Sequence, residues 1–385
     1  MRKSLISVLL ACVMAVSACA EGTVYTAAQN DESAVDVSGT QNTVITNAAI
    51  LKTGGSASSA DAASFRGVNS AVRVYDQATL TLSDSLIEST AQNATGVFAY
   101  DGGTIYISDC TVNVSGGGAG GVQVAGGGTL IGSGLTVTSA SKAAIRSDRG
   151  GGLLILDGGT YTSTGTNGCP AIYSTADITV RNALCVSERS RAVIIEGKNS
   201  VTLENVTLEG NDQSTKSGSV HANVLLYQSA SGDAREGTGV FTMTGGEITS
   251  NNGAMFYCTN TAGVINLSGV KLNCTEDDAL LIVSAGRWGK EGKNGGTCTL
   301  NAEDQELYGS ISADSISALT LRLHNSAFTG CINTDQEGGA AIVSLDEESS
   351  WTLTADSYVT SLDGDLRCVD LNGYTLYIDG AAVND

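Results

Sequence analysis

The 385-residue sequence predicts an all-β fold, a β-solenoid of about thirteen coils with roughly 24 residues in each coil. One sequence motif recurs along the chain: a short strand of alternating apolar residues, a polar or Gly turn, and a second strand. A fixed period in this range indicates coils that stack on one another. The clearest copies are Leu80-Thr81-Leu82-Ser83-Asp84, Ile105-Tyr106-Ile107-Ser108-Asp109, Ile178-Thr179-Val180-Arg181-Asn182, Val201-Thr202-Leu203-Glu204-Asn205 and Ile265-Asn266-Leu267-Ser268-Gly269.

The first residue of each alternating strand serves as an anchor for aligning the coils. Most anchors from Leu80 onward are 23 to 25 residues apart, and longer intervals predict one coil plus an inserted loop, near 209–239 and 285–297. The anchors are Thr43, Leu80, Ile105, Leu130, Leu154, Ile178, Val201, Phe241, Ile265, Cys298, Leu321, Trp351 and Leu376.

Each coil is expected to contain three strands. Alternation with period two, as in Leu319-Thr320-Leu321-Arg322-Leu323, is typical of a strand with one buried face. A strand precedes it in each coil, as in Val122-Gln123-Val124, and another follows it, as in Val206-Thr207-Leu208. Gly, Asn and Asp between the strands permit the positive φ of sharp corners. No helical period is sustained, and 48 glycines disfavour helix throughout.

The N-terminus has the pattern of an export signal, predicted over residues 1–18. Arg2 and Lys3 precede an apolar run that is too short for a permanent membrane span. The following Val16-Ser17-Ala18-Cys19 resembles a bacterial lipobox, which predicts cleavage before Cys19 and a lipid on its sulfur. Ordinary cleavage after Ala20 is the alternative, giving a secreted protein. Residues 19–40 are expected to be a linker or irregular N-terminal cap, and 41–385 a single β-helix domain.

The charge balance is strongly acidic. The chain has 20 basic and 40 acidic residues, a net charge of −20, and loss of Arg2 and Lys3 with the signal would leave 18 − 40 = −22. Such a surface repels phosphates and anionic headgroups. We therefore expect no nucleic-acid partner, and membrane contact only through a lipid on Cys19.

Cysteine usage predicts no metal site, no redox motif and no cofactor. The chain has no C-x-x-C pair and only two histidines. Several thiols fall where other coils place aliphatic residues: Cys185 aligns with Val112 and Leu208. Burial as small apolar side chains is the favoured role, and disulfides between coils remain open. Eight cysteines follow Cys19: Cys110, Cys169, Cys185, Cys258, Cys274, Cys298, Cys331 and Cys368.

The repeat length and the composition of the strands resemble those of the right-handed parallel β-helix of the pectin-lyase-like superfamily. The resemblance covers nearly the whole mature sequence. The carboxyl-terminal third, from Arg287-Trp288-Gly289-Lys290 to Ser349-Ser350-Trp351-Thr352-Leu353-Thr354, is similar to a stretch in exported β-helical proteins of gut Firmicutes. Those proteins are described as adhesin-like or autotransporter-passenger-like. The resemblance implies the fold and a surface role, and it transfers no catalytic residue.

Enzymes that cleave polysaccharides share this fold, but the sequence favours no catalytic residues. A lyase of this class needs clustered Asp residues for Ca²⁺ and a basic residue as proton acceptor, and a hydrolase needs paired carboxylates with Gly-His-Gly and Arg-x-Lys segments. The chain offers Asp277-Asp278, at a position where other coils turn, and neither His221 nor His324 lies in such a motif.

The inserted loops are the predicted binding surface. We predict ligand contacts from Arg287, Trp288 and Lys290 in one loop and from Tyr227 in the other, because an aromatic ring beside basic groups suits an acidic sugar. Packing of Trp288 onto the coils is the alternative for that residue.

Three functions follow from these patterns. The favoured one is a non-enzymatic, surface-displayed lipoprotein, adhesin-like, that binds a glycan or a host or cell-surface protein. A polysaccharide lyase or hydrolase and a structural spacer of a cell-surface assembly are the alternatives.

Overall fold

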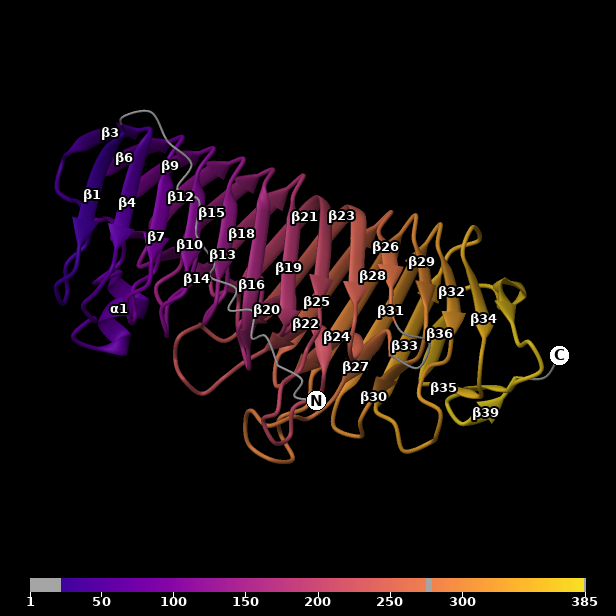
Figure 1. The fold of residues 1–385 in the computed structure, drawn as a ribbon. Helices are drawn as coiled ribbons and strands as arrows, with labels where there is room; N and C mark the ends of the chain where they lie inside the picture. Colours follow the sequence, from indigo (N-terminus) through magenta and orange to yellow (C-terminus); the bar gives the residue numbers. More distant parts are fainter. Residues whose placement is uncertain (1–21, 275–278, 384–385) are drawn as a thin grey trace, which may run out of the picture.

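The computed structural model describes residues 22–274 and 279–383. The chain forms a right-handed parallel β-helix, a rod in which successive coils stack along one axis (Figure 1). The predicted fold class is thus confirmed. The predicted signal, Cys19 and Asp277-Asp278 lie outside the described residues.

The first side of the rod, face 1, is a parallel sheet of eleven strands in sequence order. Its strands are short, and their outward side chains form one continuous row. They are β2 (Val35–Val37), β5 (Val72–Val74), β8 (Val97–Tyr100), β11 (Val122–Ala125), β14 (Ile145–Ser147), β17 (Ile172–Ser174), β20 (Val193–Glu196), β22 (Ala222–Tyr227), β24 (Ala254–Thr259), β27 (Leu281–Val283) and β30 (Ile311–Ala313).

The second side, face 2, contains the alternating strands that the repeat predicts. In the described part of the chain it has thirteen strands, but the last two predicted anchors, Trp351 and Leu376, lie elsewhere on the rod. They are β3 (Asn42–Thr46), β6 (Thr79–Ser83), β9 (Thr104–Ser108), β12 (Gly128–Ser133), β15 (Gly152–Asp157), β18 (Asp177–Arg181), the first halves of β21 (Ser200–Gly210) and β23 (Thr238–Ser250), then β25 (Ala262–Ser268), β28 (Thr297–Glu303), β31 (Ala318–His324), β33 (Ala340–Leu345) and β36 (Ser361–Asp363).

The third side, face 3, follows face 2 after a sharp corner. Residues such as Asp84, Asp109, Asn182 and Asn205 make this corner at φ between 50° and 53°, a region that Asn and Asp tolerate better than other side chains. The strands are β1 (Thr23–Ala27), β4 (Ala48–Lys52), β7 (Leu86–Ser89), β10 (Thr111–Val114), β13 (Thr136–Ser139), β16 (Thr160–Thr166), β19 (Leu184–Arg189), the second halves of β21 and β23, β26 (Lys271–Asn273), β29 (Glu306–Tyr308), β32 (Ala327–Gly330), β34 (Ser350–Leu353) and β37 (Val369–Asp370).

The core is a column of inward side chains in register. Anchors Leu80 to Ile265 pair as predicted, but Ile265 pairs with Leu300, so the expected anchor Cys298 is two residues too early. Trp351 is also misassigned, because it pairs with Phe328 on face 3. Period-two alternation looks alike on both faces, which is why spacing alone misplaced these residues.

Six of the eight cysteines in the described residues are buried as free thiols: Cys110, Cys169, Cys185, Cys258, Cys298 and Cys331. Cys185 lies between Tyr161 and Leu208 in its row, so the predicted role as a buried apolar side chain is correct there. A side-chain hydrogen bond with Cys258 raises the pKa of Cys298.

A short helix, α1 (Ala60–Arg66), interrupts the coil between β4 and β5, and the sequence pattern did not predict it. The Ser59 side chain accepts a hydrogen bond from the Ala62 N–H, and Gly67 ends the helix at φ 65°. Helix α1 and the longest loops project from the same edge of the rod (Figure 1).

Both ends of the rod are irregular. At the N-terminal end, β1 and β2 lie within the segment 19–40, where a linker or irregular cap was expected. At the other end the 3-10 helix η1 (Leu366–Cys368) precedes β37, and β35 (Ser357–Val359) pairs with β38 (Leu376–Ile378). The last strand, β39 (Ala381–Ala382), folds back antiparallel on β38 and covers its open edge.

Candidate functional site

The outward row of face 1 forms the floor of a cavity. Strand register places Arg146, Tyr173, Ile194, Leu225 and Tyr257 in line, one from each of five successive coils. Each strand contributes one outward residue to this row because side chains alternate between core and solvent. An Arg and a Tyr therefore sit side by side on a surface that is otherwise apolar here.

Loops raise walls around this row and enclose a cavity of about 280 Å³. The range 209–239, predicted as one insertion, contains strand β22 with a loop on each side of it, and the second predicted insertion lies between β27 and β28. The cavity is lined by Lys142, Arg146, Asn167, Gly168, Tyr173, Ser190, Arg191, Ile194, Asp212, Ser214, Lys216, Ser219, Leu225, Tyr227, Arg287 and Trp288.

Five basic side chains line the cavity of this acidic protein. Arg146 pairs with Asp148 at 2.8 Å, and Arg191 pairs with Asp212 at 2.9 Å. Both carboxylates are buried, so these two pairs form part of the framework. Within the described ranges, no carboxylate lies at ion-pair distance from the other three: Lys142, Lys216 and Arg287.

Lys142 has an altered protonation equilibrium. Its ammonium group donates a hydrogen bond to the Ser64 hydroxyl at 2.7 Å. Burial, followed by the positive charge of Arg146, lowers the pKa of Lys142 to about 8. The amine therefore changes charge close to neutral pH, and an anion in the cavity would favour its protonated form.

Aromatic rings form the opposite side of the cavity. The Trp288 and Tyr227 rings have centroids 4.5 Å apart, tilted by 48°, and the Arg287 guanidinium lies 4.3 Å from the Trp288 ring. Trp288 also packs on a small apolar cluster that contains Leu225 and Tyr257. Trp288 thus combines the two roles that the sequence left open, packing on the coils and lining the cavity.

A buried carboxylate fixes the two tyrosines. Glu196 is 1% exposed and accepts hydrogen bonds from the hydroxyls of Tyr173, Ser229 and, at 2.9 Å, Tyr227. Burial, followed for Tyr227 by the charge of Glu196, raises the pKa of both phenols. Both rings therefore stay neutral and rigid, and Arg146 stacks 4.3 Å over the ring of Tyr173.

The structure brings three of the four predicted ligand-binding residues together. Tyr227, Arg287 and Trp288 line the cavity, whereas Lys290 is exposed and lies outside the lining. Sequence reasoning missed Lys142, Arg146, Tyr173 and Arg191. The sequence signal for these four residues was weak. Each is a single polar residue that does not recur at the same position in neighbouring coils, so no repeated pattern marks it.

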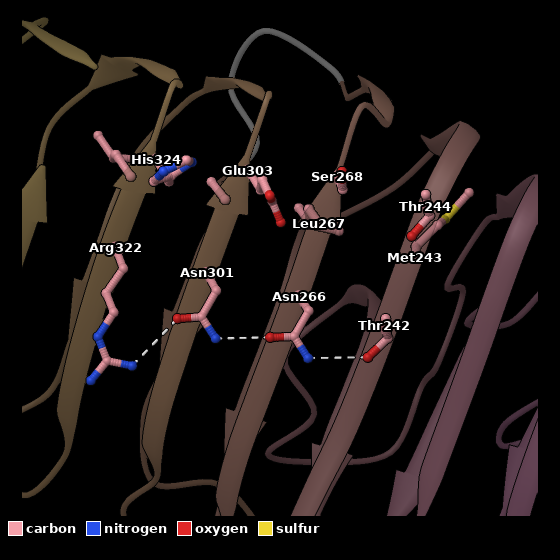
Figure 2. A pocket seen from close by; sticks show the side chains of 12 residues that line it. Thr242, Met243, Thr244, Asn266, Leu267, Ser268, Asn301, Glu303, Arg322 and His324 are labelled. Atoms are coloured by element: carbon pink, nitrogen blue, oxygen red, sulfur yellow. Dashed lines mark hydrogen bonds between the residues drawn. The ribbon is translucent and has the colours of Figure 1, made fainter. Parts of the chain in front are cut away.

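A second hollow, of about 530 Å³, lies on the outer surface of face 2 (Figure 2). Here the Asn266 amide donates to the Thr242 hydroxyl at 3.1 Å, the Asn301 amide donates to Asn266 at 2.8 Å, and Arg322 reaches Asn301 at 3.4 Å. These groups use their hydrogen-bonding capacity on one another along the ladder. The face 1 cavity has an aromatic wall and three cations that lack an ion-pair partner among the described residues, and it is therefore the stronger candidate.

The described residues offer neither a metal-binding cluster nor a membrane-spanning helix. Their His, Cys, Asp and Glu side chains form no group of three or more that could hold a metal ion. None of the helices in residues 22–274 and 279–383 is long and apolar enough to cross a membrane.

Fold and site together define a parallel β-helix with a cationic, aromatic-walled cavity on face 1. The chain matches no protein-family model, no curated protein and no solved structure.

Proposed function

We propose that this chain is a surface-displayed, non-enzymatic β-helical lipoprotein, adhesin-like, that binds an acidic glycan in the face 1 cavity. One observation supports this function above all others. Lys142, Lys216 and Arg287, without ion-pair partners among the described residues, meet Trp288 in one cavity of a chain with a net charge of −20.

The charged groups and the aromatic ring of this cavity each match one part of a sugar acid. Guanidinium and ammonium groups pair with carboxylate or sulfate, and such pairs strengthen where walls exclude water. The Trp288 ring offers an apolar surface to the hydrophobic side of a sugar ring. Small ligands bind in this kind of concave site, in which a few charged groups orient the ligand against an aromatic surface.

Display at the cell surface rests on the sequence. The lipobox-like Val16-Ser17-Ala18-Cys19 supports a lipid anchor, and the resemblance to exported adhesin-like proteins supports the role. Thirteen coils at about 4.8 Å each give a rod on the order of 60 Å long, which would hold the cavity away from the anchor.

A glycan array with wild-type protein and two variants tests the binding function. Trp288→Ala should lose the signal on acidic glycans while keeping its circular dichroism spectrum. Tyr106→Ala is the matched control, because Tyr106 is an exposed aromatic, 46% accessible, on face 2. Equal signals for all three proteins would contradict the proposed site, and no signal for any of them would favour the structural spacer.

Lys142 favours one second candidate, a polysaccharide lyase. A lysine with its pKa lowered to about 8 is partly neutral near pH 7 to 8 and is able to accept the proton next to a uronate carboxylate. Incubation with pectins and other uronates, with and without Ca²⁺, tests this candidate. Unsaturated chain ends that form with wild type but not with Lys142→Met would establish the lyase and overturn the non-enzymatic proposal.

A further inference from the structure

The outward row of face 1 is covered on the N-terminal side of the cavity. The two preceding residues of that row, Phe98 and Gln123, are completely buried. Helix α1 and the residues next to it cover them. The Gln123 amide donates to the Ser64 carbonyl at 2.8 Å, and a Cβ on Gly67 would lie 2.5 Å from the Phe98 ring.

The same row is covered on the C-terminal side. Tyr257, the next residue after Leu225, is completely buried, and its hydroxyl lies 3.4 Å from the Ala285 carbonyl oxygen. The loop between β27 and β28 is held in place by Asn294, whose amide donates to the carbonyls of Gly286 at 2.7 Å and Trp288 at 2.9 Å. This loop is therefore a fixed wall.

One arginine links the N-terminal wall to a lateral one. Arg149 pairs with Asp233 at 2.6 Å, and its guanidinium also lies 4.2 Å from the Phe65 ring of α1. On the other side, a Cβ on Gly218 would lie 3.5 Å from the Arg287 side chain, so the two long loops touch. These contacts brace α1 and the long loops beside the cavity, although Phe65, Arg149 and Asp233 do not line it.

These walls limit how much of a ligand fits. The residues of the row between these ends are Arg146, Tyr173, Ile194 and Leu225, three coil steps or about 14 Å. Ile194 and Leu225 are themselves only 5% and 1% exposed, so Arg146 and Tyr173 form the more open part of the floor. The volume of about 280 Å³ is just below the range of small-molecule sites, about 300–1,000 Å³. A polysaccharide lying along the rod would collide with α1 or with the loop that carries Trp288.

We propose that the cavity is closed at both ends along the rod and binds the terminal acidic residue of a glycan chain. This inference rests on the proposed function. The carboxylate of that residue meets Lys142, Lys216 or Arg287, its ring lies against Trp288, and the remaining chain leaves toward solvent. A free sugar acid then contains the whole recognised unit. This differs from recognition of the chain's interior, which needs an open groove.

Isothermal titration with galacturonate, glucuronate and their oligomers of increasing length tests the closed site. Affinity per chain end should be constant from dimer to long oligomer, and the free sugar acids should bind within about tenfold of the oligomers. Sulfated and phosphorylated monosaccharides form a separate arm, and tighter binding of either would reassign the anionic group. Affinity that rises steadily with chain length, with no binding of the free acids, would overturn chain-end recognition and leave the binding function intact. Failure of every acidic glycan would contradict both proposals.

Opening the wall gives a second, independent readout. Arg149→Ala removes the contact that joins Phe65 to Asp233, so longer oligomers should gain affinity relative to the free acid by about tenfold. Arg322→Ala, which removes an exposed arginine on face 2, is the matched control. It should leave the ratio of oligomer affinity to free-acid affinity unchanged. An unchanged ratio in Arg149→Ala, with the fold intact, would show that this wall does not limit the site.

Discussion

The protonation of Lys142 makes the charge of the cavity depend on pH. Its pKa in the folded protein is about 8, against an ordinary value of 10.5, because burial and Arg146 disfavour the charged form. Below about pH 8 the amine carries the charge that an acidic ligand needs, and above it the charge is lost. The folded protein therefore releases this proton at lower pH than the unfolded chain does.

We expect the affinity for an acidic sugar to fall by about tenfold between about pH 7 and about pH 9.5. Lys142→Arg should bind with little change over the same range, because a guanidinium stays protonated. Titration calorimetry across this range measures both proteins. A wild-type affinity that is independent of pH would show that Lys142 does not contact the anionic group.

Trp288 shows what the sequence reveals about single residues. An aromatic in a long interval between anchors was enough to predict it as part of the site, because loops on a rigid scaffold commonly bind ligands. Its partner Tyr227 was also predicted, although it lies on strand β22 and not in a loop. Lys290 is a basic residue of the same loop as Arg287, and both were predicted for that reason. Lys290 is exposed outside the cavity, and loop composition alone does not say which side chains point into it.

At the scale of elements, most strands were predictable and α1 was not. Alternation and corner residues identify a strand in any coil, but α1 is only seven residues long. Its local signals, Ser59 before the helix and Gly67 after it, were present in the sequence. They matter here because α1 covers the face 1 row at the N-terminal end of the cavity, so overlooking the helix also concealed that this end is closed.

Strand β34 offers a test of the stacked core. Trp351 is fully buried, donates through its indole N–H to the Gly330 carbonyl at 3.0 Å, and stacks on Phe328 with centroids 5.9 Å apart. Trp351→Ala should lower the free energy of unfolding by about 3–5 kcal/mol. Tyr106→Ala, on the outer surface, should change it by less than about 1 kcal/mol. Chemical denaturation compares them, and similar losses in both would contradict the assigned burial.

At the scale of the whole molecule, the repeat predicted the fold and coil number, but not the site. The cavity gathers residues from Lys142 to Trp288 across several coils. Their meeting depends on strand register and on loops that break the period, neither of which the spacing specifies. The sequence therefore supported a binding role through the loops, while the cationic lining of the cavity became visible only in the folded rod.

The proposed lipid anchor on Cys19 makes a separate prediction for the intact protein. Cys19→Ala should move the protein from the membrane fraction to the soluble fraction, because the substitution removes the sulfur that would carry the lipid. Cys110→Ala, which removes a buried thiol of the rod, is the control and should stay with the membranes. Unchanged partitioning of Cys19→Ala would refute lipidation and favour secretion.

The most direct test of the central claim is calorimetric titration with a sugar acid and its neutral counterpart, galacturonate against galactose. We predict that galacturonate binds at least about tenfold more tightly than galactose, that salt weakens its binding, and that Arg287→Ala loses this preference while Arg322→Ala retains it. A preference for galacturonate that survives in Arg287→Ala would place the anionic group at Lys142 or Lys216 instead. Equal binding of the two sugars would contradict the claim that this cavity recognises an acidic glycan.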